Sequence, residues 1–201
     1  MKNQRSGKAT IFTEKDIAKI RKNLDNPKHR LIFEIALYTG ERMGAVCQLK
    51  VSDVYADAEN RIPHAEITFK ARTRKARPDG TSDTRQVPIH ESLREHLKNY
   101  MPPITGYLFP GRKNNKTGIA NHISYRAVAK YWQNLFLSLN MDKRGFSTHS
   151  TRRTLITALD NNGVSVRQIQ AITGHKNINT VLEYIDSNPD RVRTTLNAVQ
   201  L

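Results

Sequence analysis

The chain has 201 residues, of which 33 are Lys or Arg and 18 are Asp or Glu, giving a formal net charge of +15. This length corresponds to one domain, or to one domain with a small appendage, and is enough to bury a core without disulfides. A single cysteine, Cys47, excludes an intramolecular disulfide scaffold and favours a reducing compartment. Without a signal-peptide pattern or an apolar run of membrane-span length, a cytoplasmic protein with no membrane partner is expected. The positive excess makes a polyanion the first partner to consider, without saying which.

The positive charge is concentrated in three stretches, residues 1–30, 70–85 and 101–153. The third stretch holds nine Lys and Arg side chains against one acidic residue, Asp142. Ordinary protein surfaces mix the two signs, so a solvated surface does not account for this stretch.

Local signals predict two helices near the start of the chain. Thr13 has N-cap chemistry and Asp16 follows at the N3 position, so a helix begins here and ends before Pro27. Residues 28–39 are almost wholly apolar and predict a buried central helix. Gly40 is its natural C′ residue.

Strand patterns follow a short helix expected over residues 42–49. Residues 65–69 and 85–89 alternate in polarity and predict an antiparallel β-hairpin, whose long basic connection has a turn signal at Pro78 and a mobile tip. Residues 51–54 are predicted to add a third strand.

Helices dominate the rest of the chain. Helical spacing resumes near residues 93–97, and the Pro- and Gly-rich residues 101–120 are predicted to form a loop. Further helices are expected at 122–139, 149–161, 165–172, 178–185 and from Pro189 onward. The predicted fold class is mainly α with a small antiparallel β-sheet (α+β).

Several common catalytic patterns are missing from the sequence. It has no Gly-rich phosphate loop ending in Lys-Ser or Lys-Thr, so an NTPase is unsupported. One cysteine and scattered histidines do not give zinc-ligand spacing, and the carboxylates do not form the converging set of a metal-dependent nuclease. Cys47 lies in an apolar helix and is read as a core residue. No metal and no cofactor are therefore expected.

A set of cations and one phenol remains. His149 and Arg152 are three residues apart at the start of a predicted helix, where free N–H groups and the helix dipole suit a phosphate. Alone, this His-x-x-Arg pattern is weak evidence. The other candidates are an arginine after the buried helix, a lysine at a strand end, a histidine in a Thr-Gly-His segment and a tyrosine nine residues beyond it: Arg42, Lys70, His175 and Tyr184.

Taken together, these segments resemble the catalytic domain of the tyrosine recombinases, the phage-type integrases and Xer-type resolving enzymes. The arginine segment is TGERMGAVCQLKVSDV, and the lysine lies in ITFKARTRK. The segment STHSTRRTLITALDNNGVSVRQIQAITGHKNINTVLEYI carries the remaining motifs in order. The match covers residues 12–190, and ordered motifs at correct distances are far more specific than any single motif.

The resemblance implies a phosphate-binding set. Arg42 and Arg152 would clamp the scissile phosphate, which suits the planar, permanently charged fork of arginine. His149 and His175 would donate to the phosphate oxygens, and His149 is also a candidate base for the phenol.

The resemblance also implies a nucleophile and a general acid. Tyr184 would attack phosphorus and form a 3′-phosphotyrosyl link, and Lys70 would protonate the departing 5′ oxygen. Lys75 lies close by and stays an alternative to Lys70. The covalent link conserves the phosphodiester energy, so rejoining needs no ATP, and protein cations can take the place of a metal.

Other basic side chains are assigned to the DNA backbone. They are Arg72, Arg74, Lys75, Arg77, Arg112, Lys113, Lys116, Lys143, Arg144 and Arg153. The partners implied are double-stranded DNA, through which the protein would associate with the nucleoid, and further copies of the chain, as a tetramer on paired sites.

The resemblance divides the chain into three parts. Residues 1–11 are a basic flexible segment, residues 12–188 a catalytic domain, and residues 189–201 a C-terminal helix that packs on its own domain or on a neighbouring protomer. Larger family members carry a separate N-terminal domain that clamps DNA, and Met1 favours a naturally short member over an excised fragment.

One position departs from the family pattern. Ala45 stands three residues after Arg42, where many members have an acidic residue, and its absence could weaken the orientation of Arg42. This departure leaves open a catalytically silent DNA-binding regulator. A type IB topoisomerase-like enzyme shares the phosphotyrosine chemistry, but the Gly-His spacing and compact length favour a recombinase. An RNA-binding or ribosome-associated protein explains the charge but not the ordered motifs.

Overall fold

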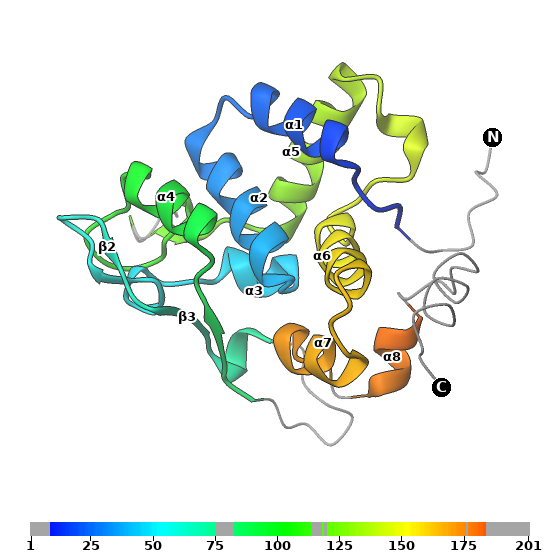
Figure 1. Cartoon of the computed structure of the whole chain (residues 1–201). Coiled ribbons are helices and arrows are strands. Elements are labelled where there is room, and N and C mark those ends of the chain that lie inside the picture. Colours follow the sequence, from blue (N-terminus) through cyan, green and yellow to red (C-terminus); the bar gives the residue numbers. More distant parts are fainter. Residues whose placement is uncertain (1–8, 75–82, 114–117, 119, 176, 184–201) are drawn as a thin grey trace, which may run out of the picture. The chain divides into compact units, whose positions relative to one another are not determined.

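The chain folds as two compact units, Met1–Leu155 and Ile156–Leu201. The computed structural model describes residues 9–74, 83–113, 118, 120–175 and 177–183. Its elements are mainly helices with short antiparallel strands, as predicted (Figure 1). The boundary between the units falls inside one helix, α6 (Ser150–Asn161). Residues 1–8 of the expected flexible segment, and the expected helix from Pro189, lie outside the described residues.

Helix α1 (Glu14–Asn23) begins with the predicted cap. The Thr13 hydroxyl accepts a hydrogen bond from the Asp16 amide at 3.2 Å, and the Asp16 carboxylate accepts one from the Thr13 amide at 3.0 Å. This reciprocal pairing satisfies two amides at the helix start. The Asp16 carboxylate also binds both Nη atoms of Arg144. The predicted start of the helix is therefore confirmed, and the cap is tied to a distant loop.

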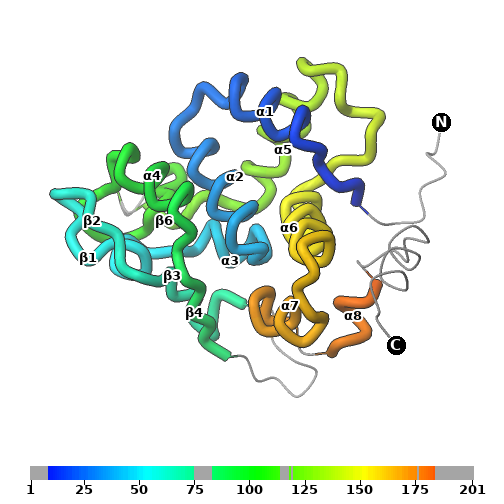
Figure 2. Tube along the Cα trace, viewed as in Figure 1, coloured from blue at the N-terminus to red at the C-terminus, as the bar shows by residue number. Residues whose placement is uncertain are grey.

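Helix α2 (Pro27–Thr39) is the central helix of the first unit. Nine of its thirteen residues are buried, as the apolar run predicted. It lies among α1, α4 (Glu91–Asn99) and α5 (Tyr125–Ser138) in Figures 1 and 2. Its buried Glu34 accepts two hydrogen bonds of 2.8 Å from Arg21, which compensates the buried charge. The short helix α3 (Met43–Cys47) follows directly.

A buried histidine in α2 makes the first unit sensitive to acid. The His29 ring is stacked on Tyr131 with centroids 3.7 Å apart, and its Nδ1 has no hydrogen-bond partner among the described residues. Burial, together with the charge of Lys28, lowers the pKa of His29 from 6.5 to about 4. Protonation therefore favours the unfolded chain between these values, so stability present above pH 6.5 is lost as the pH falls towards 4.

We expect His29→Phe, which keeps the stacked ring but cannot titrate, to remove this part of the acid sensitivity. Between pH 7 and pH 4.5, wild type should lose about 2 kcal/mol more of its free energy of unfolding than the variant. Urea denaturation of both proteins at the two pH values measures the difference. Equal losses in the two proteins would show that His29 does not titrate below its ordinary range.

The strands form three separate two-stranded antiparallel ladders in the described part of the chain. The predicted hairpin is confirmed: β3 (Glu66–Phe69) pairs with β4 (Arg85–Pro88), with Phe69 opposite Arg85. Its expected tip around Pro78 lies outside the described residues. The other ladders join β1 (Tyr55–Asp57) to β2 (Ile62–Pro63) and β5 (Pro110–Lys113) to β6 (Ala120–His122).

Two sequence predictions about strands are wrong. Residues 51–53 form a 3₁₀ turn, η1 (Val51–Asp53), because the Asp53 carboxylate accepts the Lys50 amide at 2.9 Å and closes a turn in place of a strand. The predicted loop over residues 101–120 contains β5 and the first residue of β6. Short strands of this kind depend on pairing with a partner, which local composition does not reveal.

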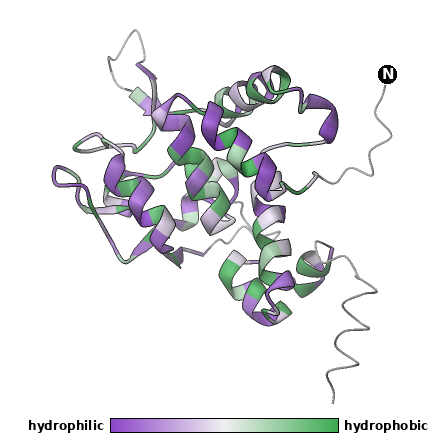
Figure 3. Cartoon of the chain, turned by 45° about the horizontal axis from the view of Figure 1, so that its top comes forward, coloured by the Kyte–Doolittle hydropathy of each residue, from purple (hydrophilic) through white to green (hydrophobic). Residues whose placement is uncertain are grey.

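The second unit has a small apolar core of its own. Ile156, Ile169 and Val181 are fully buried and come from α6, α7 (Val166–Thr173) and α8 (Ile178–Leu182). Gly174 ends α7 with a left-handed φ of 65°, as its place in the sequence predicted. The helices carry apolar and polar residues on different faces (Figure 3), as amphipathic helices do. In the described ranges, no helix combines the length and hydropathy needed to cross a bilayer.

Candidate active site

The Thr39–Arg42 segment forms a tight turn between α2 and α3. Gly40 adopts a left-handed φ of 59°, and its amide donates to the Ala36 carbonyl at 3.1 Å. The Thr39 hydroxyl accepts the Glu41 amide at 3.2 Å, and Arg42 then takes the N-cap position of α3. This T-G-E-R turn places the predicted phosphate-binding Arg42 at the start of a helix packed in the core.

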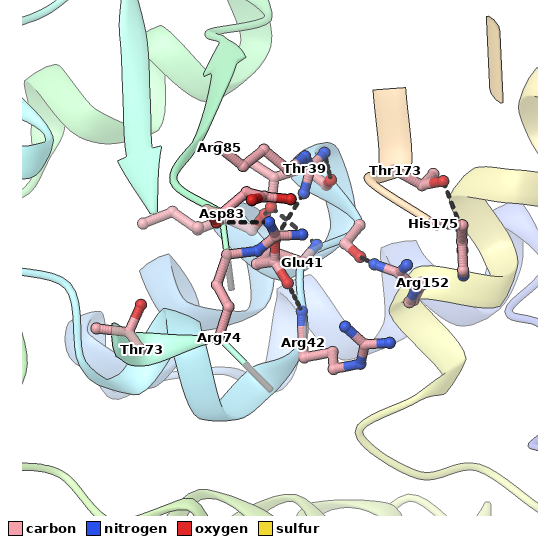
Figure 4. Close-up of polar contacts among 12 residues, drawn as sticks. Thr39, Glu41, Arg42, Thr73, Arg74, Asp83, Arg85, Arg152, Thr173 and His175 are labelled. Carbon is pink, nitrogen blue, oxygen red and sulfur yellow. Dashed lines mark hydrogen bonds and ion pairs between the residues drawn. The ribbon is translucent and has the colours of Figure 1, made fainter. Parts of the chain in front are cut away.

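Arg152 connects the first turn of α6 to the T-G-E-R turn. Its side chain is 3% exposed, and its Nη1 donates a hydrogen bond to the Gly40 carbonyl (Figure 4). The bond restricts the orientation of the guanidinium group, whose planar fork is suited to bidentate phosphate recognition. The two predicted phosphate-binding arginines, 110 positions apart in the sequence, thus come from neighbouring backbone segments of the first unit.

His149 precedes α6 and lies in the field of both arginines. Its amide donates to the Ser147 hydroxyl at 3.2 Å, and the Ser147 amide donates to the Ser150 hydroxyl at 3.0 Å. Partial burial of the ring, and then the positive charges of Arg42 and Arg152, lower the pKa of His149 below 6.5. A neutral imidazole at pH 7 can accept a proton, which is the state a base needs.

We expect an NMR titration to give His149 a midpoint below 6.5. In Arg42→Gln the midpoint should rise, because one of the two nearby positive charges that lower the pKa of His149 is removed. The matched control is Arg61→Gln, which removes an arginine from the loop between β1 and β2. A midpoint that Arg42→Gln leaves unchanged would refute the electrostatic coupling.

Glu41 is a functional candidate that the sequence reasoning missed. Its carboxylate is 1% exposed and accepts the Arg42 amide at 2.9 Å and Arg85 Nη1 at 2.8 Å, and it pairs with Arg74 Nε at 3.3 Å (Figure 4). Burial by itself raises the pKa of Glu41, but Arg85, the Arg42 amide and Arg74 outweigh it and lower the pKa. The carboxylate is therefore charged and lies one residue before Arg42, whereas Ala45 is packed in the apolar core.

Lys70 directly follows β3 and is paired with a buried carboxylate. It is the N-cap residue of a 3₁₀ turn, η2 (Ala71–Thr73), and its Nζ lies 2.7 Å from Asp53 Oδ1. The Lys70 side chain is 40% exposed while Asp53 is buried, so the pair lies at the edge of the first unit's core. An ammonium held at a partly exposed position is suited to donate a proton to a bound substrate.

The hydrogen bonds of the second unit assign a tautomer to His175. The Thr173 hydroxyl donates to the Ile169 carbonyl at 2.6 Å and lies 2.6 Å from His175 Nδ1 (Figure 4). A hydroxyl has one proton, so the His175 Nδ1–H must be the donor to Thr173. Donation from Nε2 to a phosphate oxygen then requires the protonated imidazolium. Tyr184 lies outside the described residues.

The predicted DNA-contacting cations have different surroundings. Arg74 and Arg144 are bound to the internal carboxylates of Glu41 and Asp16, and Arg153 Nη1 donates to the Ala9 carbonyl at 2.7 Å. The side chains that are exposed on the surface are Arg72, Arg112, Lys113, Lys143 and, despite its ion pair with Asp16, Arg144. The positions outside the described residues are Lys75, Arg77 and Lys116.

Neither a reactive cysteine nor a cluster of metal-ligating side chains is found in the described part of this site. Burial raises the pKa of the Cys47 thiol to about 12, so it is a core residue and not a nucleophile. Among the described residues, no three His, Cys, Asp or Glu side chains gather as metal ligands do.

Comparisons with known proteins show which family the chain is similar to. Residues 10–191 match the phage integrase family. The tyrosine recombinase XerA of Pyrococcus horikoshii is 25% identical over 194 residues, covering 94% of this chain and 61% of the relative. The tyrosine recombinase XerC of Halalkalibacterium halodurans is 30% identical over 182 residues, covering 85% of this chain and 55% of the relative.

Solved structures show the same fold. The crystal structure of XerA recombinase superimposes with a TM-score of 0.70 at 22% identity, covering 98% of this chain and 66% of that one. The structure of XerH bound to its difH substrate, a pre-cleavage complex, gives a TM-score of 0.65 at 18% identity, with 94% and 54% covered. The chain thus spans between 54% and 66% of the length of these four proteins. Since the family match extends over nearly all of its residues and includes both arginine segments, the chain belongs to the phage integrase family.

Proposed function

We propose that the chain cleaves and rejoins DNA strands as a site-specific recombinase, through a 3′-phosphotyrosyl intermediate and with neither metal nor ATP. The observation that carries this proposal is the hydrogen bond from Arg152 to the Gly40 carbonyl. It joins the His-x-x-Arg segment to the T-G-E-R turn, so Arg42, His149 and Arg152 are gathered in the first unit. Two arginines and a neutral imidazole are suited to one phosphodiester.

The proposed chemistry balances with protein groups alone. The Tyr184 oxygen forms a bond to phosphorus while the bond from phosphorus to the 5′ oxygen breaks. The phenolic proton goes to His149, and Lys70 gives a proton to the departing 5′ oxygen. Arg42, Arg152 and protonated His175 neutralise the charge that develops on the phosphoryl oxygens. Rejoining reverses each step.

The partner proposed is double-stranded DNA. The exposed basic side chains Arg72, Arg112, Lys113 and Lys143 are suited to backbone phosphates. The solved relative bound to its difH substrate supports a DNA partner for this chain as well. We also propose that the active complex is a homo-oligomer, a tetramer on paired sites.

Trapping the covalent intermediate on a library of DNA sequences tests this function and identifies the target site in the same experiment. The protein is incubated with a randomised double-stranded library that carries nicks, so that cleavage releases a short strand and prevents rejoining. Covalent complexes are precipitated with SDS and potassium, and their DNA is sequenced. Wild type should enrich a defined sequence in buffer containing EDTA, and Tyr184→Phe should give no covalent complex.

Each other outcome points to a different function. Sequence-selective binding without any covalent complex would overturn the proposal in favour of a silent regulator. Covalent complexes with no sequence preference, together with relaxation of supercoiled DNA, would indicate a topoisomerase-like enzyme.

A further inference from the structure

The short turn that carries Lys70 is held by a buried carboxylate at each end. Lys70, at the N-cap of η2, pairs with Asp53 at 2.7 Å. Arg74, at the C-cap of the same turn, pairs with Glu41 at 3.3 Å, and its side chain is 8% exposed. The position of the Lys70 ammonium group therefore depends on both anchors.

The anchor at Glu41 also holds the strand opposite Lys70. Arg85 is the first residue of β4 and is paired in register with Phe69, the residue before Lys70. Its Nη1 donates to the Glu41 carboxylate and its Nη2 to the Thr39 carbonyl, at 2.8 and 2.9 Å. The end of the hairpin next to its long connection is thus bound to the T-G-E-R turn through two hydrogen bonds from one buried guanidinium group.

The remaining contact of Glu41 reaches the phosphate-binding side. Oε1 of Glu41 accepts the Arg42 amide at 2.9 Å, which fixes the backbone where α3 begins. In Figure 4 the Arg42 side chain extends away from this carboxylate, so Glu41 holds the backbone and leaves the guanidinium group outside the cluster. The Glu41 carboxylate therefore contacts the Arg42 amide, Arg74 on the Lys70 turn and Arg85 on the opposite strand.

We infer that Glu41 is a positioning residue for the proposed strand cleavage. Its carboxylate couples the Lys70 turn to Arg42, so that the general acid Lys70 and the phosphate-binding Arg42 keep a fixed separation. The inference rests on the proposed function. It also accounts for activity without an acidic side chain at Ala45, because the carboxylate that holds Arg42 comes from the residue before it. A displacement of a reacting group by about 1 Å can slow a reaction by about a hundredfold.

Glu34 provides the matched control. It is also a fully buried glutamate of the first unit that is paired with an arginine, Arg21, but it contacts neither the T-G-E-R turn nor the lysine turn. Glu41→Gln leaves the buried Arg74 and Arg85, and Glu34→Gln the partly exposed Arg21, without a counter-charge, and both variants should have a lower melting temperature. Only Glu41→Gln should change the chemistry of the folded protein.

Single-turnover cleavage at a temperature where all variants are folded measures that difference. Relative to wild type, Glu41→Gln should slow cleavage by about tenfold to a hundredfold, and Glu34→Gln by no more than about twofold. In a Lys70→Ala background the effect of Glu41→Gln should shrink, because the group that it positions is already gone. Equal rate losses for the two glutamate variants, or fully additive losses with Lys70→Ala, would overturn the inference. The appearance of adduct with wild type reports separately on the proposed function.

Amide hydrogen exchange tests the coupling without any catalysis. In Glu41→Ala, exchange should accelerate together at the Arg42 amide and at the amides of Thr73 and Arg74, which bond to Lys70 and Ala71 carbonyls in wild type. In Glu34→Ala these amides should exchange as in wild type. Acceleration at Arg42 without acceleration in the lysine turn would contradict the proposed link even if no adduct were ever detected.

Discussion

Arg152→Lys is expected to lower the rate constant for DNA cleavage by about a hundredfold to a thousandfold, although the charge is kept. The guanidinium group donates to the Gly40 carbonyl with one nitrogen, which restricts its orientation at the T-G-E-R turn. Lysine has a single flexible ammonium group and cannot hold this fork geometry. Binding of DNA should weaken far less, since backbone contacts spread over many cations supply most of the affinity.

The adjacent arginine is the control for this prediction. Arg153 lies on the same helix and also donates from Nη1 to a backbone carbonyl, that of Ala9. Arg153→Lys should leave the cleavage rate constant within a few-fold of wild type. Single-turnover cleavage with saturating protein separates rate from binding. A rapid Arg152→Lys enzyme, or an equally slow Arg153→Lys enzyme, would refute the assignment of Arg152 to the phosphate.

Lys70→Ala is expected to slow cleavage of ordinary DNA by about a hundredfold to ten thousandfold and to be rescued by a sulfur substitution. An alkoxide is a poor leaving group and needs a proton, whereas a thiol with a pKa of about 8.5 leaves readily as a thiolate. If the bridging 5′ oxygen is replaced by sulfur, Lys70→Ala should cleave at nearly the wild-type rate. The comparison isolates proton donation from every other role of the lysine.

Two lysines serve as controls in the same assay. Lys75→Ala decides the alternative that the sequence leaves open, because rescue by sulfur should follow whichever lysine is the general acid. Lys50→Ala changes a cation that lies over the Tyr107 ring, and it should behave as wild type on both substrates. A Lys70→Ala enzyme that remains slow on the sulfur substrate would show that Lys70 acts by binding or structure and not as a proton donor.

The helices could be predicted from the sequence because their signals are local. Thr13 with Asp16, Asn26 before Pro27, and Gly40 and Gly174 at helix ends each mark a boundary within a few residues of itself. The strand predicted near Asp53 failed because one carboxylate capped the Lys50 amide and closed a turn. The β5 and β6 strands were missed since their pairing partner, and not their own composition, stabilises them.

Sequence motifs were enough to propose some residues of the candidate site. They could not predict the ion pairs between residues that are far apart in the sequence. Arg42, Lys70, His149 and Arg152 could be proposed as site residues from ordered motifs. Glu41 could not, because its partners Arg74 and Arg85 are more than 30 positions away and carry no local signal. The same reason explains why Arg74 and Arg144 were assigned only to DNA: a count of positive charge does not show which cations are bound to internal carboxylates.

The identity of the amino acid joined to DNA tests the central claim most directly. The covalent complex is digested with protease and nuclease, and the remaining nucleotide-linked peptide is sequenced by mass spectrometry. The proposed mechanism predicts a single modified peptide with the nucleotide on Tyr184, joined through its 3′ phosphate. A nucleotide on any other residue, or a link through a 5′ phosphate, would contradict it.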